Sequence, residues 1–287
     1  MKPRHVCFTS FLILETLLLL CTASVQTWAQ ERPGEEKAND PCSGPTALFA
    51  LLNRPTVADS ACVAKPGNVV LETGFQRQVS RDALPGTLTT YPNADVRIGL
   101  PRGWELDVLP PNWNIGTGTE ASGSLSRVAG FGDVGFGAKY EIGQFHDVLL
   151  AIDTVITVPS GANAFRSRGT QAAVNGIFAY SLTPRFGIGG ELSVATLTGS
   201  SGAQPGRFTL LTPDLVATYQ MPFPLQFYGE LYGTGDTGGV ARNYWFDGGV
   251  QYLITSRWEA DIEAGVLVHS TRGTASHYFG FGFGFLF

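Results

Sequence analysis

The sequence has little charge, almost no methionine and no long apolar run beyond its N-terminus. Only 15% of its 287 residues are charged and only 2 are methionine, whereas about 25% charge is usual in soluble domains. No later stretch reaches the roughly 20 apolar residues of a membrane-spanning helix, so a helical membrane protein is excluded. The chain is therefore either soluble or crosses a membrane as strands. A mean hydropathy of +0.07 fits strands, because lipid-facing and lumen-facing positions average out.

Residues 1–29 have the pattern of a secretory signal peptide. Lys2 and Arg4 precede an apolar stretch, Phe11–Leu20, and Thr27-Trp28-Ala29 fits a small-x-small cleavage site. Removal of this segment takes away two bases and one acid, which moves the formal charge from −5 to −6. An acidic exported chain argues against a nucleic-acid partner.

The mature chain would keep two cysteines, Cys42 and Cys62, within an N-terminal segment of residues 30–68. An even pair in an exported protein favours a disulfide, worth about 3 kcal/mol for a loop of this length. A metal site is the weaker reading, because no histidine lies near either cysteine. Thr46–Asn53 has helical composition, with Thr46 as cap. The stapled segment is interpreted either as a plug inside the barrel described below or as a periplasmic knob that shields the first strand.

The last eleven residues, HYFGFGFGFLF, show a strict period of two. Phenylalanines occupy every second position from Phe279 to Phe287, which is the pattern of a strand. No amphipathic helix in the sequence could cover this ridge, so its partner is expected to be lipid. A strand can face lipid only inside a closed barrel, where every backbone group is paired.

Similar alternation continues from Val69 to the end of the chain. Residues 69–287 are therefore predicted to form an all-β, antiparallel, up-and-down transmembrane barrel of about twelve strands. The connections alternate between three to five residues and eight to twenty, as in outer-membrane barrels; the longest predicted loop is Pro110–Ala129. The expected partners are the outer-membrane bilayer and, through the strand that ends at Phe287, the barrel-assembly machinery. The predicted strands are Val69–Gln76, Ala94–Leu100, Trp104–Val108, Asp133–Ile142, Val148–Ile156, Val174–Tyr180, Phe186–Val194, Leu211–Gln220, Leu225–Tyr232, Tyr244–Tyr252, Trp258–Val266 and His277–Phe287.

The charged strand positions fall on the face opposite the lipid. A base on the lipid face would cost about 2–4 kcal/mol at the midplane. The energetic cost and the alternation along each strand therefore both place the charged residues in the lumen. An acidic lumen favours cations and neutral solutes over anions. The alternative is that these groups pair among themselves and pack a closed interior, in a structural or adhesive barrel without transport. The predicted lumen-lining residues are Glu72, Asp95, Arg97, Glu105, Asp107, Lys139, Asp153, Glu191, Asp214, Glu230, Asp247, Glu259, Asp261 and Glu263.

About twelve strands lie between a barrel filled by its own side chains and one with an aqueous channel. A narrow pore is therefore expected. Glycines on the inward face would either widen one side of the lumen or make room for the stapled segment. They are Gly135, Gly137, Gly187, Gly189, Gly280, Gly282 and Gly284.

Catalytic chemistry has little support in the sequence. G-x-S-x-G, H-E-x-x-H and phosphate-loop motifs are missing. His269 or His277 with Ser270 or Ser276 is a conceivable Ser/His pair on one outer loop. The prediction is a protein that is not an enzyme and has no catalytic residue, metal or cofactor.

Three segments resemble a known family. They are Gly130–Tyr140 (GFGDVGFGAKY), Leu100–Asp107 (LPRGWELD), and Cys42 with Cys62 around Arg54-Pro-Thr56. Together they are similar to the MetA-pathway of phenol degradation family of bacterial outer-membrane proteins, over roughly residues 41–287. The resemblance implies an outer-membrane barrel that passes small organic compounds, aromatic ones among the candidates. It brings no binding residues with it.

Overall fold

The computed structural model describes residues 40–81, 85–119, 124–201, 204–237 and 242–287. The predicted signal peptide and the beginning of the stapled segment lie outside the described residues. Within these ranges no helix has the length and apolarity needed to cross a membrane. Nearly all of the ordered structure is one antiparallel sheet.

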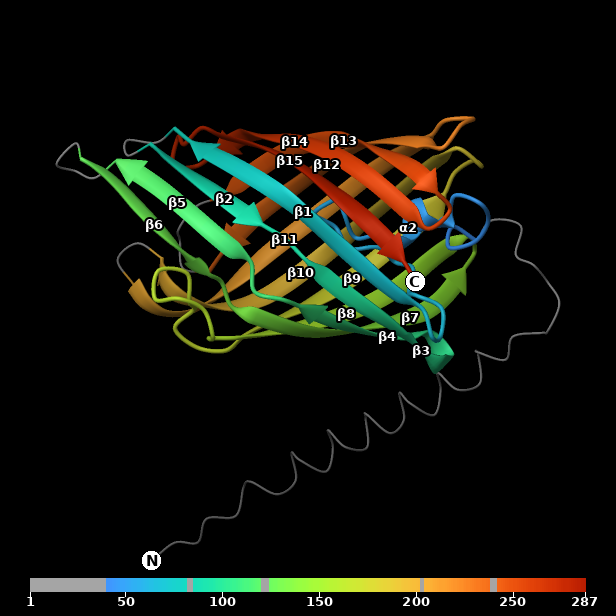
Figure 1. Ribbon diagram of the computed structural model, residues 1–287, viewed down its shortest axis with the longest axis horizontal. Helices are drawn as coiled ribbons and strands as arrows, with labels where there is room; N and C mark the ends of the chain where they lie inside the picture. Colours follow the sequence, from blue (N-terminus) through green and yellow to red (C-terminus); the bar gives the residue numbers. More distant parts are fainter. Residues whose placement is uncertain (1–39, 82–84, 120–123, 202–203, 238–241) are drawn as a thin grey trace, which may run out of the picture. The chain divides into compact units, whose positions relative to one another are not determined.

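The sheet closes on itself, because β1 pairs with β15 as well as with its sequence neighbours (Figure 1). Eleven consecutive residue pairs, from Val70 with Leu286 to Ser80 with Ser276, form this seam. The strands are β1 (Val69–Ser80), β2 (Gly86–Tyr91), β3 (Asp95–Leu100), β4 (Trp104–Leu109), β5 (Trp113–Thr119), β6 (Leu125–Phe131), β7 (Val134–Phe145), β8 (Val148–Val158), β9 (Gln171–Ser181), β10 (Phe186–Ser201), β11 (Gln204–Gln220), β12 (Leu225–Asp236), β13 (Asn243–Thr255), β14 (Trp258–Ser270) and β15 (Ser276–Leu286).

Three barrel strands are each broken into two pieces, so the fifteen segments make a closed barrel of twelve strands. The breaks separate β2 from β3, β4 from β5, and β6 from β7. Pro92 lies in the first break and Pro110 and Pro111 lie in the second; proline has no N–H to donate to a ladder. The predicted fold class and strand number are confirmed.

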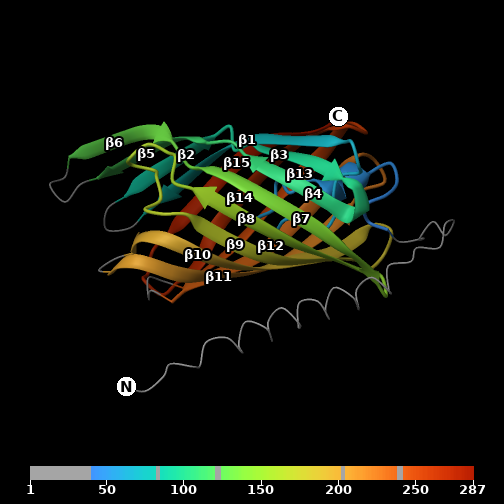
Figure 2. The same cartoon turned by 90° about the horizontal axis from the view of Figure 1, so that it is seen from below.

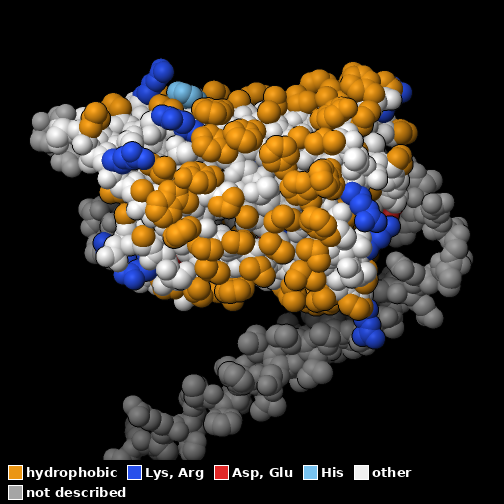
Figure 3. Space-filling view, viewed as in Figure 1, with side chains coloured by type: hydrophobic (Ala, Val, Ile, Leu, Met, Phe, Trp, Pro, Cys, Tyr) orange, Lys and Arg blue, Asp and Glu red, His pale blue; other side chains and the backbone are white. Residues whose placement is uncertain are grey.

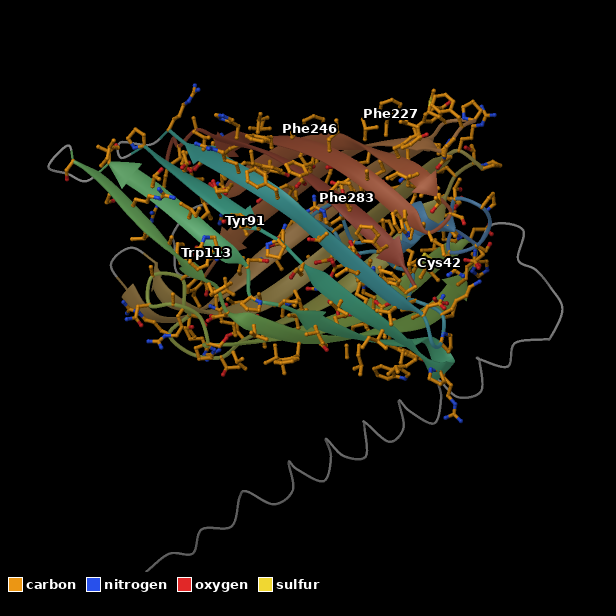
Figure 4. All side chains as sticks on the ribbon, viewed as in Figure 1. Cys42, Tyr91, Trp113, Phe227, Phe246 and Phe283 are labelled. Atoms are coloured by element: carbon orange, nitrogen blue, oxygen red, sulfur yellow. A yellow bond between two sulfur atoms is a disulfide. The ribbon has the colours of Figure 1, made fainter. Side chains whose placement is uncertain are left out.

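The outer surface carries the apolar half of each alternating pattern. On β15, Phe279, Phe281 and Phe283 are 41–47% exposed, whereas Tyr278, which points to the inward face of the same strand, is 6% exposed. Hydrophobic side chains cover most of the middle of the face in Figure 3, and Lys and Arg side chains gather toward its two ends. Phe227, Phe246 and Phe283 point away from the barrel in Figure 4. An apolar band between two charged rims is the surface that a bilayer covers.

The predicted loop at residues 110–129 is wrong. It contains β5 and β6. β5 pairs with β2 on one side and with β6 on the other, and the two strands extend the sheet beyond the rest of the barrel (Figure 2). Likewise β10 reaches Ser201 and β11 begins at Gln204, where a longer loop was expected. These extensions are rich in Gly, Ser and Thr. They lack the apolar alternation that lipid imposes, so the strand signal is absent although the backbone pairs.

The stapled segment begins with a short helix, α2 (Ala47–Leu51). Thr46 is the N-cap residue, as predicted, but its side chain makes no capping hydrogen bond. The predicted disulfide between Cys42 and Cys62 is present, with Cα atoms 5.6 Å apart. Figure 4 shows Cys42 at the end of the barrel that carries the short turns.

The core of the protein lies between this segment and the inner wall. Leu48, Phe49 and Leu52 pack with Val70 of β1 and Leu253 of β13. Farther along, Ala61 and Cys62 pack with residues of β8 and β9, and Ala58 packs with Val216 of β11 and Tyr228 of β12. The segment therefore touches the wall on several sides of the lumen.

Candidate functional site: an acidic lumen with a segment inside it

Two of the inward carboxylates, Glu72 and Glu105, meet at Arg97 of β3, whose side chain is fully buried. Its guanidinium donates to Glu105 Oε1 at 2.8 Å and to Glu72 Oε1 at 3.0 Å. The same group donates to the backbone carbonyls of Leu51 at 2.6 Å and Cys62 at 3.1 Å. Arg97 thus joins β1 and β4 to two points of the stapled segment, the end of α2 and Cys62. A buried charge needs such complete pairing, because desolvation is otherwise costly.

Lys139 of β7 extends this cluster. Its Nζ lies 3.9 Å from Glu105 Oε1 and donates to the side-chain oxygen of Asn53 at 3.0 Å. Asn53 also receives the N–H of Ser60 on the same oxygen. Two wall bases therefore hold residues of the stapled segment.

Arg54 supplies a second ionic contact, from the segment to β14, which lies on the other side of the β1–β15 seam from Arg97. Its guanidinium donates to Asp261 at 2.9 Å and to Glu263 at 3.4 Å, both on β14. Burial alone would lower the pKa of Arg54, but these two carboxylates raise it above its ordinary value. The guanidinium therefore stays charged.

Four wall carboxylates accept backbone N–H groups of the segment. Glu72 on β1 accepts those of Asn53 and Arg54, and Glu105 on β4 accepts that of Ala64. Glu230 on β12 accepts those of Val57 and Ala58, and Glu191 on β10 accepts that of Asp59 at 2.9 Å.

Residues 53–64 form neither helix nor strand. Their N–H groups have no ladder to join and would be costly to bury unpaired. Charge-assisted bonds to carboxylates on four strands supply the partners. The segment is thus attached to the wall around the lumen at its backbone, whatever its side chains are.

Two of the inward glycines lie where the segment approaches the wall. A Cβ added to Gly282 would overlap the guanidinium of Arg54, and one on Gly284 would overlap the side chain of Leu52. Of the two roles predicted for inward glycines, making room for the segment fits these positions.

The remaining predicted lumen residues are also turned inward but have fewer partners. Asp153 accepts the side-chain amide of Asn175 at 3.1 Å, and Asp95 lies 3.5 Å from that of Asn53. Asp107 and Glu259 are 5% and 0% exposed. Asp214 of β11 and Asp247 of β13 face the other side of the lumen.

A cavity of about 370 Å³ lies beside the segment. Its floor includes Arg54–Val57 and Asp59, and its wall includes residues from each of the three strand breaks. Glu72, Asp95 and Glu263 line it as well.

Asp133, in the third strand break, fastens the β8–β9 loop beside this cavity. Its carboxylate accepts the N–H groups of Ser160, Gly161 and Ser167, and the hydroxyl of Ser167. Burial by itself would raise the pKa of Asp133, but these bonds outweigh burial and hold the pKa below its ordinary value.

The described part of the chain has no group of three or more His, Cys, Asp or Glu residues that could hold a metal ion. Two of the residues considered for a Ser/His pair, His269 and Ser276, have other contacts. The ring of His269 packs on Tyr244, and Ser276 accepts from Gln78 and donates to the carbonyl of Val79.

Sequence reasoning missed Arg54, the residue that reaches across to β14. A signal was present, because Arg54 is the only base between Cys42 and Cys62. A lone base in a segment predicted to lie near an acidic lumen is a candidate ion-pair partner.

Residues 52–287 match the family described as "Putative MetA-pathway of phenol degradation". The chain belongs to this family. The match begins at Leu52, directly after α2, and includes the whole barrel, so the predicted resemblance is confirmed. Among curated proteins, none matches the chain.

Solved structures with the same fold are outer-membrane barrels. An outer membrane channel from Pseudomonas putida F1 is 12% identical, with a TM-score of 0.60, and the match covers 81% of this chain and all of that one. The transport unit of the autotransporter AIDA-I from Escherichia coli is 11% identical, with a TM-score of 0.57 and coverage of 84% and 94%. The NanC porin is 13% identical, with a TM-score of 0.51 and coverage of 76% and 98%. At these identities the likeness establishes the barrel fold.

Proposed function

We propose that this family member is a passive channel or facilitator for small neutral or cationic organic solutes, closed at rest by residues 41–65. One observation carries the proposal: the N–H groups of this segment are bonded to carboxylates on four different strands. A segment held in this way blocks the lumen while its bonds last. In the described part of the chain, the connection to β1 is the only covalent link between the segment and the barrel, so the segment could move out once these bonds break.

The charge of the wall supports the choice of solute. Twelve of the fourteen predicted lumen residues are carboxylates, and the two wall bases, Arg97 and Lys139, are both engaged with the segment or its partners. Movement of the segment would also remove Arg54 from Asp261 and Glu263. The opened lumen would then be strongly acidic, which favours cations and disfavours anions.

The family description supports aromatic compounds as candidates among the organic solutes. The same proposal includes export through a cleaved signal peptide at residues 1–29 and recognition of β15 and the following Phe287 by the barrel-assembly machinery. It also places the end of the barrel with the long loops at the cell exterior.

A specific observation also favours a second candidate, a structural barrel with a permanently packed lumen. Arg97 is fully buried, and all its bonds join the wall and the segment. Such a network would stabilise a barrel that never opens. Solute flux separates the two candidates.

The test is uptake by proteoliposomes of three small solutes of similar size: neutral benzyl alcohol, cationic benzylamine and anionic benzoate. Benzylamine and benzoate are compared at a pH where each is ionised, with protein-free liposomes as the background for passive leak. The proposal predicts protein-dependent uptake of the first two, faster in a variant that lacks residues 30–65, and exclusion of benzoate. Equal uptake with and without folded protein, for both versions, would favour the packed barrel.

A further inference from the structure

The lumen wall formed by β11, β12, β13 and β15 carries a cluster that the stapled segment does not use. We define the aromatic–acid wall as Asp214, Tyr232, Trp245, Asp247 and Tyr278. Asp214 is opposite Tyr232 in the strand register, and Tyr232 is opposite Trp245. Asp247 is opposite Gly265, which in turn is opposite Tyr278. The five residues therefore occupy two adjacent rows on one inner surface.

The three rings form a nearly continuous aromatic surface. Tyr232 and Trp245 are parallel within 4°, with ring centroids 6.0 Å apart, and Trp245 lies 5.9 Å from Tyr278. Tyr278 lies across Gly265, where a Cβ would overlap its ring. Tyr232 and Trp245 are half-buried, so parts of both rings remain accessible from within the barrel.

The carboxyl groups of this wall have no basic partner among the described residues. Both carboxylate oxygens of Asp214 and one oxygen of Asp247 are buried and accept no N–H or O–H of the described residues, and both carboxyl groups lie against that of Glu230. The other oxygen of Asp247 accepts the hydroxyl of Tyr278. Among the described residues, the ion pairs of the lumen involve Arg54, Arg97 and Lys139, and none includes either aspartate.

A second buried group has the same unused capacity. The hydroxyl of Tyr228, a residue that is 6% exposed, has no partner among the described residues. Tyr228 lies on β12 two residues before Glu230, on the same inward face. Unpaired carboxylates beside electron-rich ring faces are the arrangement that recognises an organic cation, because ring quadrupole and charge act together.

We propose that the aromatic–acid wall binds the ammonium group of an organic cation that enters the lumen. The inference rests on the proposed function and names its substrate class more narrowly. The faces of Tyr232 and Trp245 contact the alkyl or aryl substituents, and Asp214 and Asp247 balance the charge. A neutral aromatic alcohol contacts the same rings but balances no charge, so it binds more weakly.

The wall lies next to the attachment of the stapled segment. Asp247 is opposite Glu230 in the register, and Glu230 accepts the N–H groups of Val57 and Ala58. A cation bound at Asp247 therefore competes with the N–H groups of Val57 and Ala58 for the carboxylate of Glu230. Binding at this wall weakens that attachment.

The test is titration of the intact mature protein in detergent with benzyltrimethylammonium, followed by calorimetry and by tryptophan fluorescence. Benzyl alcohol is the neutral comparison. The expected result is saturable binding of the cation at least tenfold tighter than that of the alcohol. Quenching should be lost in Trp245→Phe and kept in the outward Trp258→Phe, while calorimetric binding persists in both.

Charge variants complete the test. Asp214→Asn and Asp247→Asn should each weaken cation binding about tenfold, whereas Glu259→Gln, a buried lumen carboxylate outside the wall, should not change it. Equal binding of the cation and the alcohol, no saturable binding, or affinity unchanged in both aspartate variants would overturn the proposal. Because binding is measured without a membrane, a protein that binds the cation but passes no solute would refute only the channel function. Each variant's folding is checked by its heat-modifiable migration on a gel.

Discussion

Substitution of Arg97 by Met should loosen the stapled segment more than any other single change in the wall. Arg97 is fully buried and makes four bonds, two to carboxylates of the wall and two to carbonyls of the segment. Methionine has a comparable length and fills the space, but it leaves Glu72 and Glu105 as buried charges without their main partner. The loss of one member of a buried ion pair typically costs about 3–5 kcal/mol.

This cost falls largely on the state in which the segment is seated. When the segment leaves, water can reach both carboxylates and relieve the unpaired charge. At about 1.4 kcal/mol for each factor of ten, the population in which the segment has left the wall should rise roughly 100- to 4,000-fold. The assay is hydrogen–deuterium exchange of residues 53–64 in the folded protein, since their amides are protected by the wall carboxylates.

Two comparison variants make this result specific. In Arg97→Met with Glu72→Gln and Glu105→Gln, the buried charges are gone together, so much of the protection should return. Arg77→Met removes an exposed outward base on β1 and should leave exchange unchanged. Slow exchange of residues 53–64 in a folded Arg97→Met protein would refute the reasoning that the ion pairs hold the segment.

Three further predictions concern other parts of the molecule. Because the pKa of Asp133 is depressed, its bonds stabilise the β8–β9 loop above about pH 4, and this stabilisation is lost as the pH falls through the lower pKa of the folded protein. Hydrogen exchange of residues 159–168 should therefore rise only in strong acid. At neutral pH Asp133→Asn should speed trypsin cleavage at Arg166 or Arg168, and unchanged cleavage would contradict the role of Asp133 in holding the loop. Reduction of the Cys42–Cys62 disulfide should destabilise the seated segment by up to about 3 kcal/mol, seen as faster exchange near Ala61 while the barrel's melting temperature stays within a few degrees; a collapse of the whole barrel would be the contrary result. Phe281→Lys on the lipid face of β15 should lower the unfolding free energy in lipid by about 2–4 kcal/mol, measured by reversible denaturation in vesicles against Phe281→Leu, and equal stability of the two variants would contradict lipid contact there.

The barrel was predictable because lipid imposes a strict pattern. The phenylalanines of His277–Phe287 and the charged residues opposite them fix which face of each strand looks outward. The alternation of side chains along each strand was then enough to predict that Glu72, Arg97 and Glu230 face the lumen. The disulfide followed from two cysteines left in an exported chain.

Features of the fold that are not subject to this lipid-imposed pattern could not be predicted from the sequence. β5 and β6 mix Gly, Ser and Thr with irregularly spaced apolar residues such as Trp113, Val128 and Phe131, so no strict side-chain period marks them. The contacts of Arg54 with Asp261 and Glu263 join residues more than 200 positions apart, and no local rule predicts which carboxylates it will reach. The use of Glu191 and Glu230 as acceptors for backbone N–H groups depends on the path of an irregular segment, which only the folded chain defines.

The most direct test of the central claim is single-channel conductance in a planar bilayer, with the intact mature protein compared with a version that lacks residues 30–65. Both proteins must first be shown to be folded. The account predicts little current from the intact protein and a clear rise on deletion, with a reversal potential that shows cation selectivity. If neither folded protein conducts, or if deletion leaves the conductance unchanged, the segment does not close a channel.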